Sequence, residues 1–478
     1  MQELNRLARG AAVEELHLEL LSDRRLRDLA ELVNALWSEP DLEPDGAEAI
    51  RFEWLAPLIA FEQRRRISSD AVQSPIPVIP PLSTVFQPVV DLRTGTAVAY
   101  EALTRRGPEP GSGFPQALFD TARRAGRIVD VDRECWHTTL RSATTSALNG
   151  AYSLLINVEP ESFQSGLLTD LPPASPVVVE LTERALLSSP GELLAMVEQA
   201  RAEGHAIAID DLGANPASLA LVPLIDPDVV KLDLRLIQAR PDAEIARVMS
   251  ALNTHASTTD VVIIAEGVET AKHVVTAQAL GATHAQGWHF GRPTARVPDG
   301  PTLAGLPITA RPAAAYPDAR SPFEVVTEHI APRSSHRALL VQMSIFLEAR
   351  ARASGDSAVV ISTFQHASNV TPGASKRYLD LAEHCALVMV HVDGPTPALD
   401  ASPIHVAPIA AGDALLQEWD IVVLTADFAA VLVARETDPS RHAEGVYEFV
   451  LSHDRALAVA AARHLIHRTA SGRARAHP

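Results

Sequence analysis

Residues 204–213 read Gly204-His205-Ala206-Ile207-Ala208-Ile209-Asp210-Asp211-Leu212-Gly213, and this stretch decides the fold. A short apolar run between glycine turns is typical of a buried strand, and this run ends in two adjacent carboxylates. Neighbouring side chains on a strand point to opposite faces, so both aspartates can serve one site only where the strand ends and the backbone turns. Close carboxylates raise each other's pKa unless a cation compensates. The stretch indicates either a divalent-metal site or a solvated turn in which Asp caps the next helix.

The same pattern recurs through the middle of the chain. Other short apolar runs end at Asn157, Glu180, Lys231 and Glu266, and helical stretches separate them. A succession of such strands predicts an α/β fold of the barrel type, in which the carboxyl ends of parallel strands meet at one face. The recurrence therefore favours a site built from several strand ends over an isolated solvated turn.

Composition and charge limit the possible functions. The chain has 478 residues, 47% hydrophobic and 21% charged, as expected for a folded soluble protein of several domains.

No apolar run approaches the roughly 20 residues needed to span a bilayer, and Met1 is not followed by a secretory leader, so we expect no membrane association and a cytoplasmic location. The net charge of −18 argues against binding of extended nucleic acid, although a small phosphate ligand remains possible in a locally cationic pocket. Cys135 and Cys385 are too few for a disulfide scaffold or a cysteine-based zinc site.

The pattern along the chain predicts four segments. Residues 1–80 read as a helical N-terminal segment that ends in a proline-rich linker. Residues 82–296 hold the predicted barrel, and the proline-rich residues 297–321 read as an extended linker. Residues 322–470 show a weaker α/β pattern, which predicts a second, smaller domain.

The barrel segment carries an ordered series of motifs. It opens with a predicted hairpin around a glycine turn at Gly95, and the second strand contains Glu101-Ala102-Leu103 followed by Arg105. This run resembles the signature of the EAL-type cyclic di-GMP phosphodiesterases. Further pieces follow in the order of that family: Phe86-Gln87-Pro88 before the run and, after it, Ile156-Asn157, Glu180-Leu181-Thr182-Glu183, Asp210-Asp211, Lys231-Leu232-Asp233, Glu266-Gly267-Val268-Glu269-Thr270 and Gln286-Gly287 through Phe290 to Pro293. A three-letter match alone means little, whereas an ordered series across residues 82–296 is specific.

The resemblance implies a fold, a reaction and a metal centre. The fold is a TIM-like (β/α)8 barrel, and the reaction is hydrolysis of cyclic di-GMP to linear pGpG with two Mg²⁺ or Mn²⁺ ions. Oxygen-only ligands suit such hard cations better than zinc. By resemblance Asp210 bridges the two ions. The full ligand set that the resemblance implies is Glu101, Asn157, Glu180, Asp210, Asp211 and Glu266.

The resemblance also implies roles for the remaining motif residues. Lys231, Glu266 and Gln286 are the candidate catalytic residues, with Glu266 acting either as general base or as metal ligand. The candidate substrate-binding residues are Gln87, Leu103, Arg105, Asp233 and Pro293. Glu183 and Glu269 are expected to support the loop after Asp211. Two structural alternatives stay open: Lys231 could form a salt bridge with Asp233, and Arg105 could pair with Glu101 on a helix surface.

The loop after the paired aspartates departs from the family pattern. The family commonly reads Asp-Phe-Gly, a small residue, Gly and an aromatic, whereas residues 212–218 contain Asn215 and Pro216 at the corresponding places. Asn tolerates a left-handed backbone and Pro stiffens the turn. Because this loop couples metal binding to dimerisation in the family, we expect a homodimer through the EAL domain.

Two other functions remain open. The first is a catalytically weak or inactive EAL receptor that binds cyclic di-GMP and signals to a partner, which the altered loop favours. The second is an unrelated Mg²⁺-dependent barrel that uses Lys231 as a base, as enolase-like barrels do, because fold alone does not fix function. The ordered matches of Gln87, Arg105 and Gln286 disfavour the second.

The C-terminal region resembles the DICT sensory domain. Residues 358–362, 386–391, 420–424 and 428–434 are predicted strands, and residues 376–385 and 456–467 are predicted helices. The resemblance rests on Ser362-Thr363-Phe364-Gln365 and on residues 420–436. It implies a role in bacterial signal transduction and brings no catalytic motif.

Overall fold

The computed structural model describes most of the chain after residue 78. Contacts divide the chain at Val78, and the unit from Ile79 to Pro478 contains every element reported below. The described residues are 79–107, 116–145, 153–159, 162, 177–181, 190–213, 219, 221–257, 259–297, 305–308, 310–313, 320–425, 427–437 and 445–474. The helices predicted within residues 1–78 lie outside this set.

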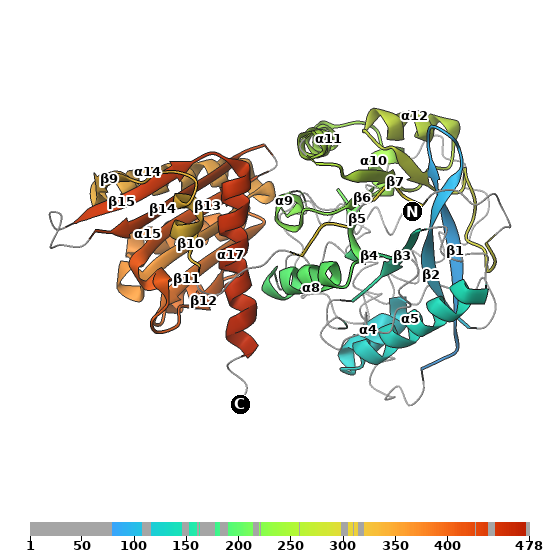
Figure 1. Ribbon diagram of the computed structural model, residues 1–478, viewed down its shortest axis with the longest axis horizontal. Helices are drawn as coiled ribbons and strands as arrows, with labels where there is room; N and C mark the ends of the chain where they lie inside the picture. Colours follow the sequence, from blue (N-terminus) through green and yellow to red (C-terminus); the bar gives the residue numbers. More distant parts are fainter. Residues whose placement is uncertain are drawn as a thin grey trace, which may run out of the picture. The chain divides into compact units, whose positions relative to one another are not determined.

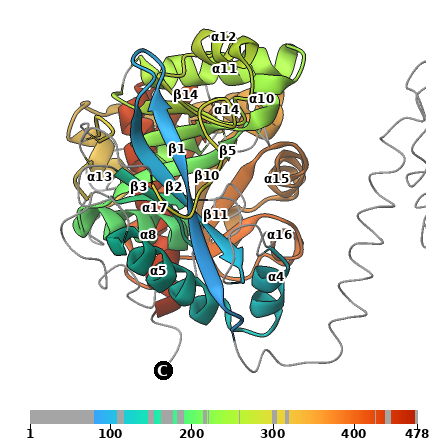
Figure 2. The same cartoon turned by 90° about the vertical axis from the view of Figure 1, so that its right-hand side faces the viewer.

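The first folded region is a closed barrel of eight strands (Figure 1). Its strands are β1 (Leu82–Asp91), β2 (Ala97–Arg106), β3 (Ser153–Asn157), β4 (Val177–Leu181), β5 (Ala206–Leu212), β6 (Val229–Leu232), β7 (Val262–Ala265) and β8 (His284–Gln286). β1 runs antiparallel to both β2 and β8, whereas the pairs from β2 through to β8 are parallel. The β1–β2 hairpin runs along one side of the barrel (Figure 2). The predicted TIM-like barrel and its opening hairpin are confirmed.

Strand alternation separates an apolar half of the barrel interior from a polar half. Leu155 in β3 is fully buried and Asn157 follows two residues later, and the same spacing separates buried Val178 from Glu180 in β4. Side chains two apart on a strand share a face, so each strand carries an apolar residue below and a polar residue above on the inward face. The polar candidates therefore gather at the carboxyl ends of the strands.

Part of the proline-rich segment after the barrel packs against the apolar half. Leu306 is 6% exposed and joins an apolar cluster that includes Leu155 and Val178. Its amide donates a hydrogen bond to Ser153 Oγ at 3.2 Å, at the start of β3. Within residues 297–321, this piece therefore closes the N-terminal end of the barrel instead of extending freely.

Helices cover the outside of the barrel, and polar residues cap several of them. The described helices are α4 (Gln116–Arg124), α5 (Ile128–Thr145), α8 (Pro190–Ala202), α9 (Val222–Ile225), α10 (Leu234–Gln238), α11 (Ala243–Ala256) and α12 (Ala271–Ala279). Asp233, Asp242 and Thr270 each accept a backbone hydrogen bond at the start of α10, α11 and α12. Such caps satisfy amides that have no partner within the helix, which fixes where each helix begins.

The second folded region is built on a seven-stranded mixed sheet (Figure 1). Its strands, in sheet order, are β12 (His405–Pro408), β11 (Leu387–Asp393), β10 (Val359–His366), β13 (Glu418–Leu424), β14 (Ala429–Glu436), β15 (Val446–Ser452) and β9 (Arg333–His336). The strands β10 and β11 with the helix between them, and the antiparallel pair β13–β14, confirm the α/β pattern predicted for this region.

Helices cover both faces of this sheet. α14 (Arg337–Ser354) and α15 (Pro372–His384) pack on one face, where Leu340, Tyr378 and Val360 belong to one apolar cluster. α13 (Pro322–Thr327) and α17 (Arg455–Ala474) pack on the other, and the short helix α16 (Pro397–Asp400) lies beside α15 and β12. Among the described residues, no helix combines the length and apolar character that crossing a membrane requires.

A buried histidine under α17 makes this region's stability depend on pH. His391 on β11 is 2% exposed, and burial together with the charge of Arg468 lowers its pKa to about 3. The unfolded histidine titrates near its ordinary value of about 6.5, so between these values the unfolded chain binds more protons and stability rises with pH. The relevant quantity is the free energy of unfolding of wild type minus that of His391→Asn. We expect this difference to increase by up to about 1.4 kcal/mol per pH unit between pH 4 and 6.5, and then to level off.

Urea denaturation of both proteins from pH 4 to 8 measures this difference. Asp420, on the same sheet face, has a pKa raised well above its ordinary value by burial and by Glu418, so it opposes the trend of His391. Because Asp420 is present in both proteins, its contribution cancels in the comparison. A difference that stays constant across this pH range would show that His391 accepts a proton in the folded state.

Candidate active site

A single lysine lies at the centre of the polar half of the barrel. Lys231 on β6 is completely buried, and its position in the strand directs the side chain inward beside β5 and β7. Its Nζ lies 2.7 Å from Glu266 Oε1, 2.8 Å from Glu180 Oε1 and 2.8 Å from Asp210 Oδ1. A fourth carboxylate, Glu101 on β2, lies at 3.3 Å. The lysine therefore joins strand ends from around the barrel.

The charges in this cluster do not balance. One ammonium group faces four carboxylates, and these contacts leave Glu180 Oε1, Asp210 Oδ1 and Lys231 Nζ without well-aligned hydrogen bonds. Burial raises the pKa of Glu180 well above its ordinary value and that of Glu266 to about 8. Burial opposes the charge on Lys231, but the carboxylates, Asp210 first, raise its pKa well above its ordinary value. Such excess negative charge fits further cations in the site.

Amide side chains bind the same carboxylates. Asn157 Nδ2 donates to Glu180 Oε2 at 2.9 Å and to Glu101 Oε1 at 3.4 Å. Gln286 Nε2 donates to Glu101 Oε2 and, at 3.1 Å, to Gln87 Oε1. These contacts join β8 and β1 to β2 and β3, so the amides fix the orientation of Glu101 and Glu180 while leaving their own oxygens available as metal ligands.

The turn at the end of β5 lets both aspartates serve one site, as the sequence predicted. Asp211 has a φ of 54°, and the pairing of β5 with β6 shifts register between Ile209 and Leu212. The left-handed backbone turns Asp211 toward the side that Asp210 occupies. Burial and the charge of Asp210 raise the pKa of Asp211 to about 6.

Two groups of carboxylates share Asp210. Ligand atoms of Glu101, Glu180 and Asp210 lie within 4.8 Å of one another, and the same holds for Asp210, Asp211 and Glu266. All of these ligands are oxygen atoms, and the buried charge is strongly negative, so the residues present fit a pair of hard divalent cations such as Mg²⁺ or Mn²⁺. The candidate ligands of the metal centre are thus brought together, with Asp210 common to both groups.

Arg105 and Leu103 line a cavity of about 250 Å³ next to this cluster, together with Asn157. Arg105 Nη1 donates to its neighbouring carbonyl, Thr104 O, at 2.9 Å, and Arg105 lies on β2 and not on a helix. The alternative of a helical Glu101–Arg105 surface pair is therefore wrong. A guanidinium beside the carboxylate cluster is suited to hold a phosphate group.

The cavity also contains residues that the sequence did not point to. Asp132 on α5 is 2% exposed and accepts a hydrogen bond from the Glu159 amide at 3.1 Å, and both line the cavity. Asp132 lies within a helix and follows no strand, so the pattern of strand ends could not reveal it. Glu159 follows Asn157 closely, which is the one signal that could have found it.

Other candidates lie at the edge of the site or outside the described residues. Asp233 Oδ1 accepts from the Arg235 amide at 2.8 Å and caps α10, and Asp233 is absent from the ion pairs of Lys231 described above. Pro293 is half-buried after β8, and the Glu269 side chain is exposed. Glu183 and residues 214–218 lie outside the described residues, so the loop-supporting role of both glutamates stays a prediction.

An exposed aromatic residue follows β8 and was missed by the sequence argument. Trp288 is 55% exposed, and the Arg292 guanidinium lies 4.0 Å from its ring centroid. Between them, Gly291 O accepts a hydrogen bond from Gln87 Nε2 at 3.5 Å. The residues after β8 therefore contact the rim of the site, although an exposed tryptophan has no signature in the sequence pattern.

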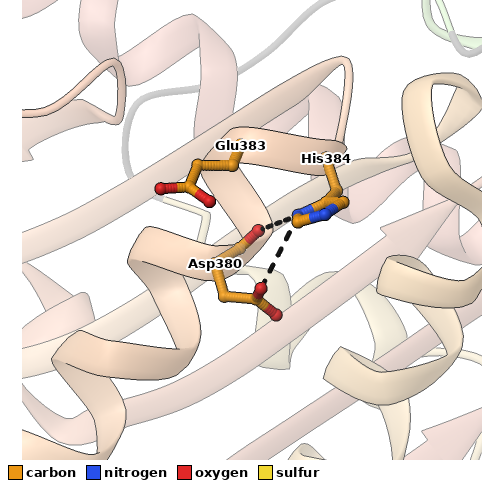
Figure 3. A group of neighbouring side chains, drawn as sticks. All are labelled: Asp380, Glu383 and His384. Carbon is orange, nitrogen blue, oxygen red and sulfur yellow. Dashed lines mark hydrogen bonds and ion pairs between the residues drawn. The ribbon is translucent and has the colours of Figure 1, made fainter. Parts of the chain in front are cut away.

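A third group of ligand-type residues lies on α15 in the second region (Figure 3). His384 Nδ1 is 2.7 Å from Asp380 O and 3.6 Å from Asp380 Oδ1, whereas no dashed line joins Glu383 to either residue in Figure 3. Arg352 forms an ion pair with Asp380 through two nitrogens, and this bond lowers the pKa of Asp380. Because its carboxylate is exposed and already neutralised, this group is a solvated helix surface.

The fold and the cluster together define a TIM-like barrel protein with a carboxylate cluster at the carboxyl ends of its strands. The chain belongs to the EAL-domain family. A family model described as "EAL domain" matches residues 81–293. A second, described as "Sensory domain in DIguanylate Cyclases and Two-component system" (DICT), matches residues 324–437.

Curated relatives are similar to a little under half of this chain. An uncharacterized protein of Mycobacterium tuberculosis is 31% identical over 234 residues, which cover 44% of this chain and 74% of that protein. The cyclic di-GMP phosphodiesterase RocR of Pseudomonas aeruginosa is 29% identical over 223 residues, 44% of this chain and 56% of RocR. The chain spans only 31% and 27% of the length of relatives from Azorhizobium caulinodans and Sinorhizobium fredii.

Solved structures of EAL proteins are also similar to this chain. The structure described as the PaMucR phosphodiesterase in complex with c-di-GMP, from a protein of Pseudomonas aeruginosa, is 27% identical. The match covers 45% of this chain and 92% of that one, with a TM-score of 0.39.

Proposed function

We propose that the barrel is a metal-dependent phosphodiesterase that hydrolyses cyclic di-GMP to linear pGpG. The observation that carries the proposal is the buried cluster around Lys231, in which two carboxylate groups share Asp210. The relative RocR carries the name cyclic di-GMP phosphodiesterase, and the family model of the EAL domain matches the barrel residues. In the reaction, water adds to phosphorus, one phosphodiester P–O bond breaks, and the ring opens to a terminal phosphate and a free hydroxyl.

The chain's own residues position the substrate and balance its charge. Lys231 places an ammonium group where negative charge develops on a phosphate oxygen, and its burial strengthens that interaction. Arg105 holds the substrate from the cavity beside β2, and Gln87 reaches the same rim through its contact with Gln286. Glu266, whose pKa lies near neutrality in the metal-free site, is suited to accept a proton from water or to bind metal.

Two divalent ions, when bound by the carboxylate groups, would supply charge neutralisation and a water of lowered pKa. We propose Glu101, Asn157, Glu180 and Asp210 as ligands of one ion, and Asp210, Asp211 and Glu266 as ligands of the other. Mg²⁺ and Mn²⁺ both match this set of oxygen ligands. We further propose that the EAL domain forms a homodimer, as the resemblance implies.

A second candidate is a receptor that binds cyclic di-GMP without cleaving it. The sequence of residues 212–218 favours it, because Asn215 and Pro216 replace the pattern common in the family. The two functions differ in one measurable respect, since both predict binding and only the enzyme predicts turnover.

The test is hydrolysis of cyclic di-GMP by the full chain with Mg²⁺ or Mn²⁺, with binding recorded in parallel. In Glu101→Gln the charge of one metal ligand is lost while the size and shape of the side chain are retained, so we expect turnover to fall by about 100-fold or more. Glu134→Gln is the matched control, because Glu134 is an exposed carboxylate that pairs with Arg141 on α5. Its turnover should equal that of wild type.

The outcomes separate the candidates. Metal-dependent turnover that Glu101→Gln loses and Glu134→Gln keeps supports the phosphodiesterase. Binding without turnover in the wild-type chain overturns it in favour of the receptor. If the wild-type chain neither binds nor cleaves cyclic di-GMP, both candidates are excluded.

A further inference from the structure

The C-terminal helix α17 is covered on more than one side. No residue from 457 to 469 is exposed, although the helix stands at the end of the described chain. One side packs on β13 and β14 of the sensory-domain sheet, and another contacts α8 and α9 of the barrel. Ala458, Ala462 and Leu465 belong to the same apolar cluster as Val197 and Ile225. A helix with contacts on more than one side joins the structures that it packs against.

Three arginines from separate segments converge on the backbone of residues 224–227, at the end of α9 and just after it. Arg463 of α17 donates from Nε to Leu224 O at 2.7 Å. Arg201 of α8 donates to Ile225 O at 2.9 Å and to Asp226 O at 2.7 Å. Arg311, beyond the barrel, donates to Pro227 O at 2.6 Å and lies 3.1 Å from Asp226 Oδ1. Hydrogen bonds from charged donors are stronger than neutral ones, so this short segment is held firmly.

The backbone needs that support because it is strained and buried. Asp226 ends α9 in the left-handed conformation, with a φ of 51° and no glycine to relieve it. Arg201 is 6% exposed, and Arg463 is one of the charges that lower its pKa after burial itself. Like charges repel, and the carbonyl oxygens that both guanidinium groups bind, together with Glu198 at 3.6 Å from Arg201, offset this repulsion.

The supported segment leads directly into the strand of the central lysine. Asp228 is 4% exposed, and its Oδ2 accepts from the Ile207 amide of β5 at 2.8 Å, while Oδ1 accepts from the Arg311 amide at 3.3 Å. β6 begins at the next residue and carries Lys231. Leu224 O, which accepts from Arg463, therefore belongs to the segment that leads into β6. In the sequence this segment lies between the paired aspartates of β5 and Lys231.

We propose that the sensory domain regulates the barrel through α17, and that Arg463 is the contact that transmits the position of α17 to β6. This inference rests on the proposed function of the barrel. When α17 lies against α8, Arg463 completes the support of residues 224–227, and Lys231 is aligned with its four carboxylates. A signal that shifts α17 withdraws one of the three donors and loosens that segment. Arg463 is a positioning residue, since its hydrogen bond goes to Leu224 O and not to a candidate site residue among those that the structure describes.

Hydrogen exchange of the full chain, combined with ligand binding and turnover, tests the proposal. In Arg463→Ala we expect the amides of Leu224, Ile225 and Asp226 to exchange about tenfold faster, because the loss of one charged hydrogen bond loosens the turn locally. Turnover of cyclic di-GMP should fall several-fold through kcat, with KM little changed. Arg463→Lys retains the charge and a donor, so it should recover part of both effects.

Arg455→Ala is the matched control. Arg455 lies on the same helix, but its Nη1 donates to Thr425 O at 3.0 Å, within the sensory domain. We expect this variant to leave both the exchange of residues 224–226 and turnover unchanged. Exchange that is equally slow in Arg463→Ala and wild type overturns the proposal, as does faster exchange in both variants.

The readouts distinguish this proposal from the proposed function. If the wild-type chain binds cyclic di-GMP without turnover, the enzyme proposal fails and the coupling is judged by binding of Mn²⁺ and cyclic di-GMP. Faster exchange with weaker Mn²⁺ binding in Arg463→Ala then supports the coupling. Faster exchange with unchanged binding overturns the coupling, as does faster exchange with unchanged turnover where wild type is active. In either case the loosening of residues 224–226 would have no effect on the site.

Discussion

Replacement of Lys231 by Met should unfold the metal-free protein at a much lower temperature and abolish turnover. The ammonium group lies within 3.3 Å of Glu101, Glu180, Asp210 and Glu266, so its removal leaves four carboxylates without their shared cation. Removing one partner of a buried ion pair costs about 3 to 5 kcal/mol. We expect a loss of that order in the free energy of unfolding, and a fall in turnover of about 100-fold or more, since the methionine cannot stabilise charge on a phosphate.

The same variant should respond more strongly to metal. The lysine competes with divalent ions for the carboxylate oxygens, so without it Mn²⁺ meets a more negative site. Thermal unfolding with and without Mn²⁺ measures this, and the rise in Tm should be larger for Lys231→Met than for wild type. Lys272→Met is the control, because Lys272 is an exposed lysine on α12. Equal Tm values for metal-free wild type and Lys231→Met would contradict the prediction.

Most of the site could be predicted because it follows from strand periodicity. Asn157, Glu180, Lys231 and Glu266 each end an apolar run, and a parallel barrel brings such ends to one face whatever the intervening helices contain. Even the left-handed turn at Asp211 follows from the sequence, since two adjacent carboxylates can share a site only at such a turn.

The rest depends on contacts between distant segments, which no local pattern records. Asp132 comes from the second turn of α5 and follows no strand. The salt bridge of Lys231 with Asp233 that spacing suggested gives way to ion pairs with carboxylates from other strands. Leu306 lies in a proline-rich stretch that reads as a linker, yet it fills the end of the barrel, because burial of an apolar side chain depends on what the fold places next to it. The contact of Arg463 with Leu224 joins residues more than two hundred positions apart.

Replacement of Gly287 by Ala should lower both stability and turnover, although Gly287 is not a candidate metal ligand. Gly287 has a φ of 153°, and a Cβ added there would lie 2.2 Å from Val268 O and 2.4 Å from Val268 N. Both atoms are held, because the Val268 amide donates to Gln286 O and Val268 O accepts from the His289 amide, each at 3.0 Å. The backbone cannot yield without breaking these bonds, so we expect a loss of about 3 kcal/mol or more in the free energy of unfolding.

The steric clash of the new Cβ with Val268 should also lower turnover, because it displaces the neighbouring residue Gln286. A displaced Gln286 no longer donates to Glu101 and Gln87, so cyclic di-GMP turnover should fall by at least about tenfold in protein that remains folded. Gly95→Ala is the matched control, since Gly95 has a φ of 71° but open space around its Cα, and it should lose only the roughly 1 to 2 kcal/mol of the left-handed backbone. Urea denaturation and turnover of both variants measure the two effects. Equal losses in Gly287→Ala and Gly95→Ala would mean that the residues after β8 move away from Val268 at little cost, and that Gln286 is not held in place by this close approach.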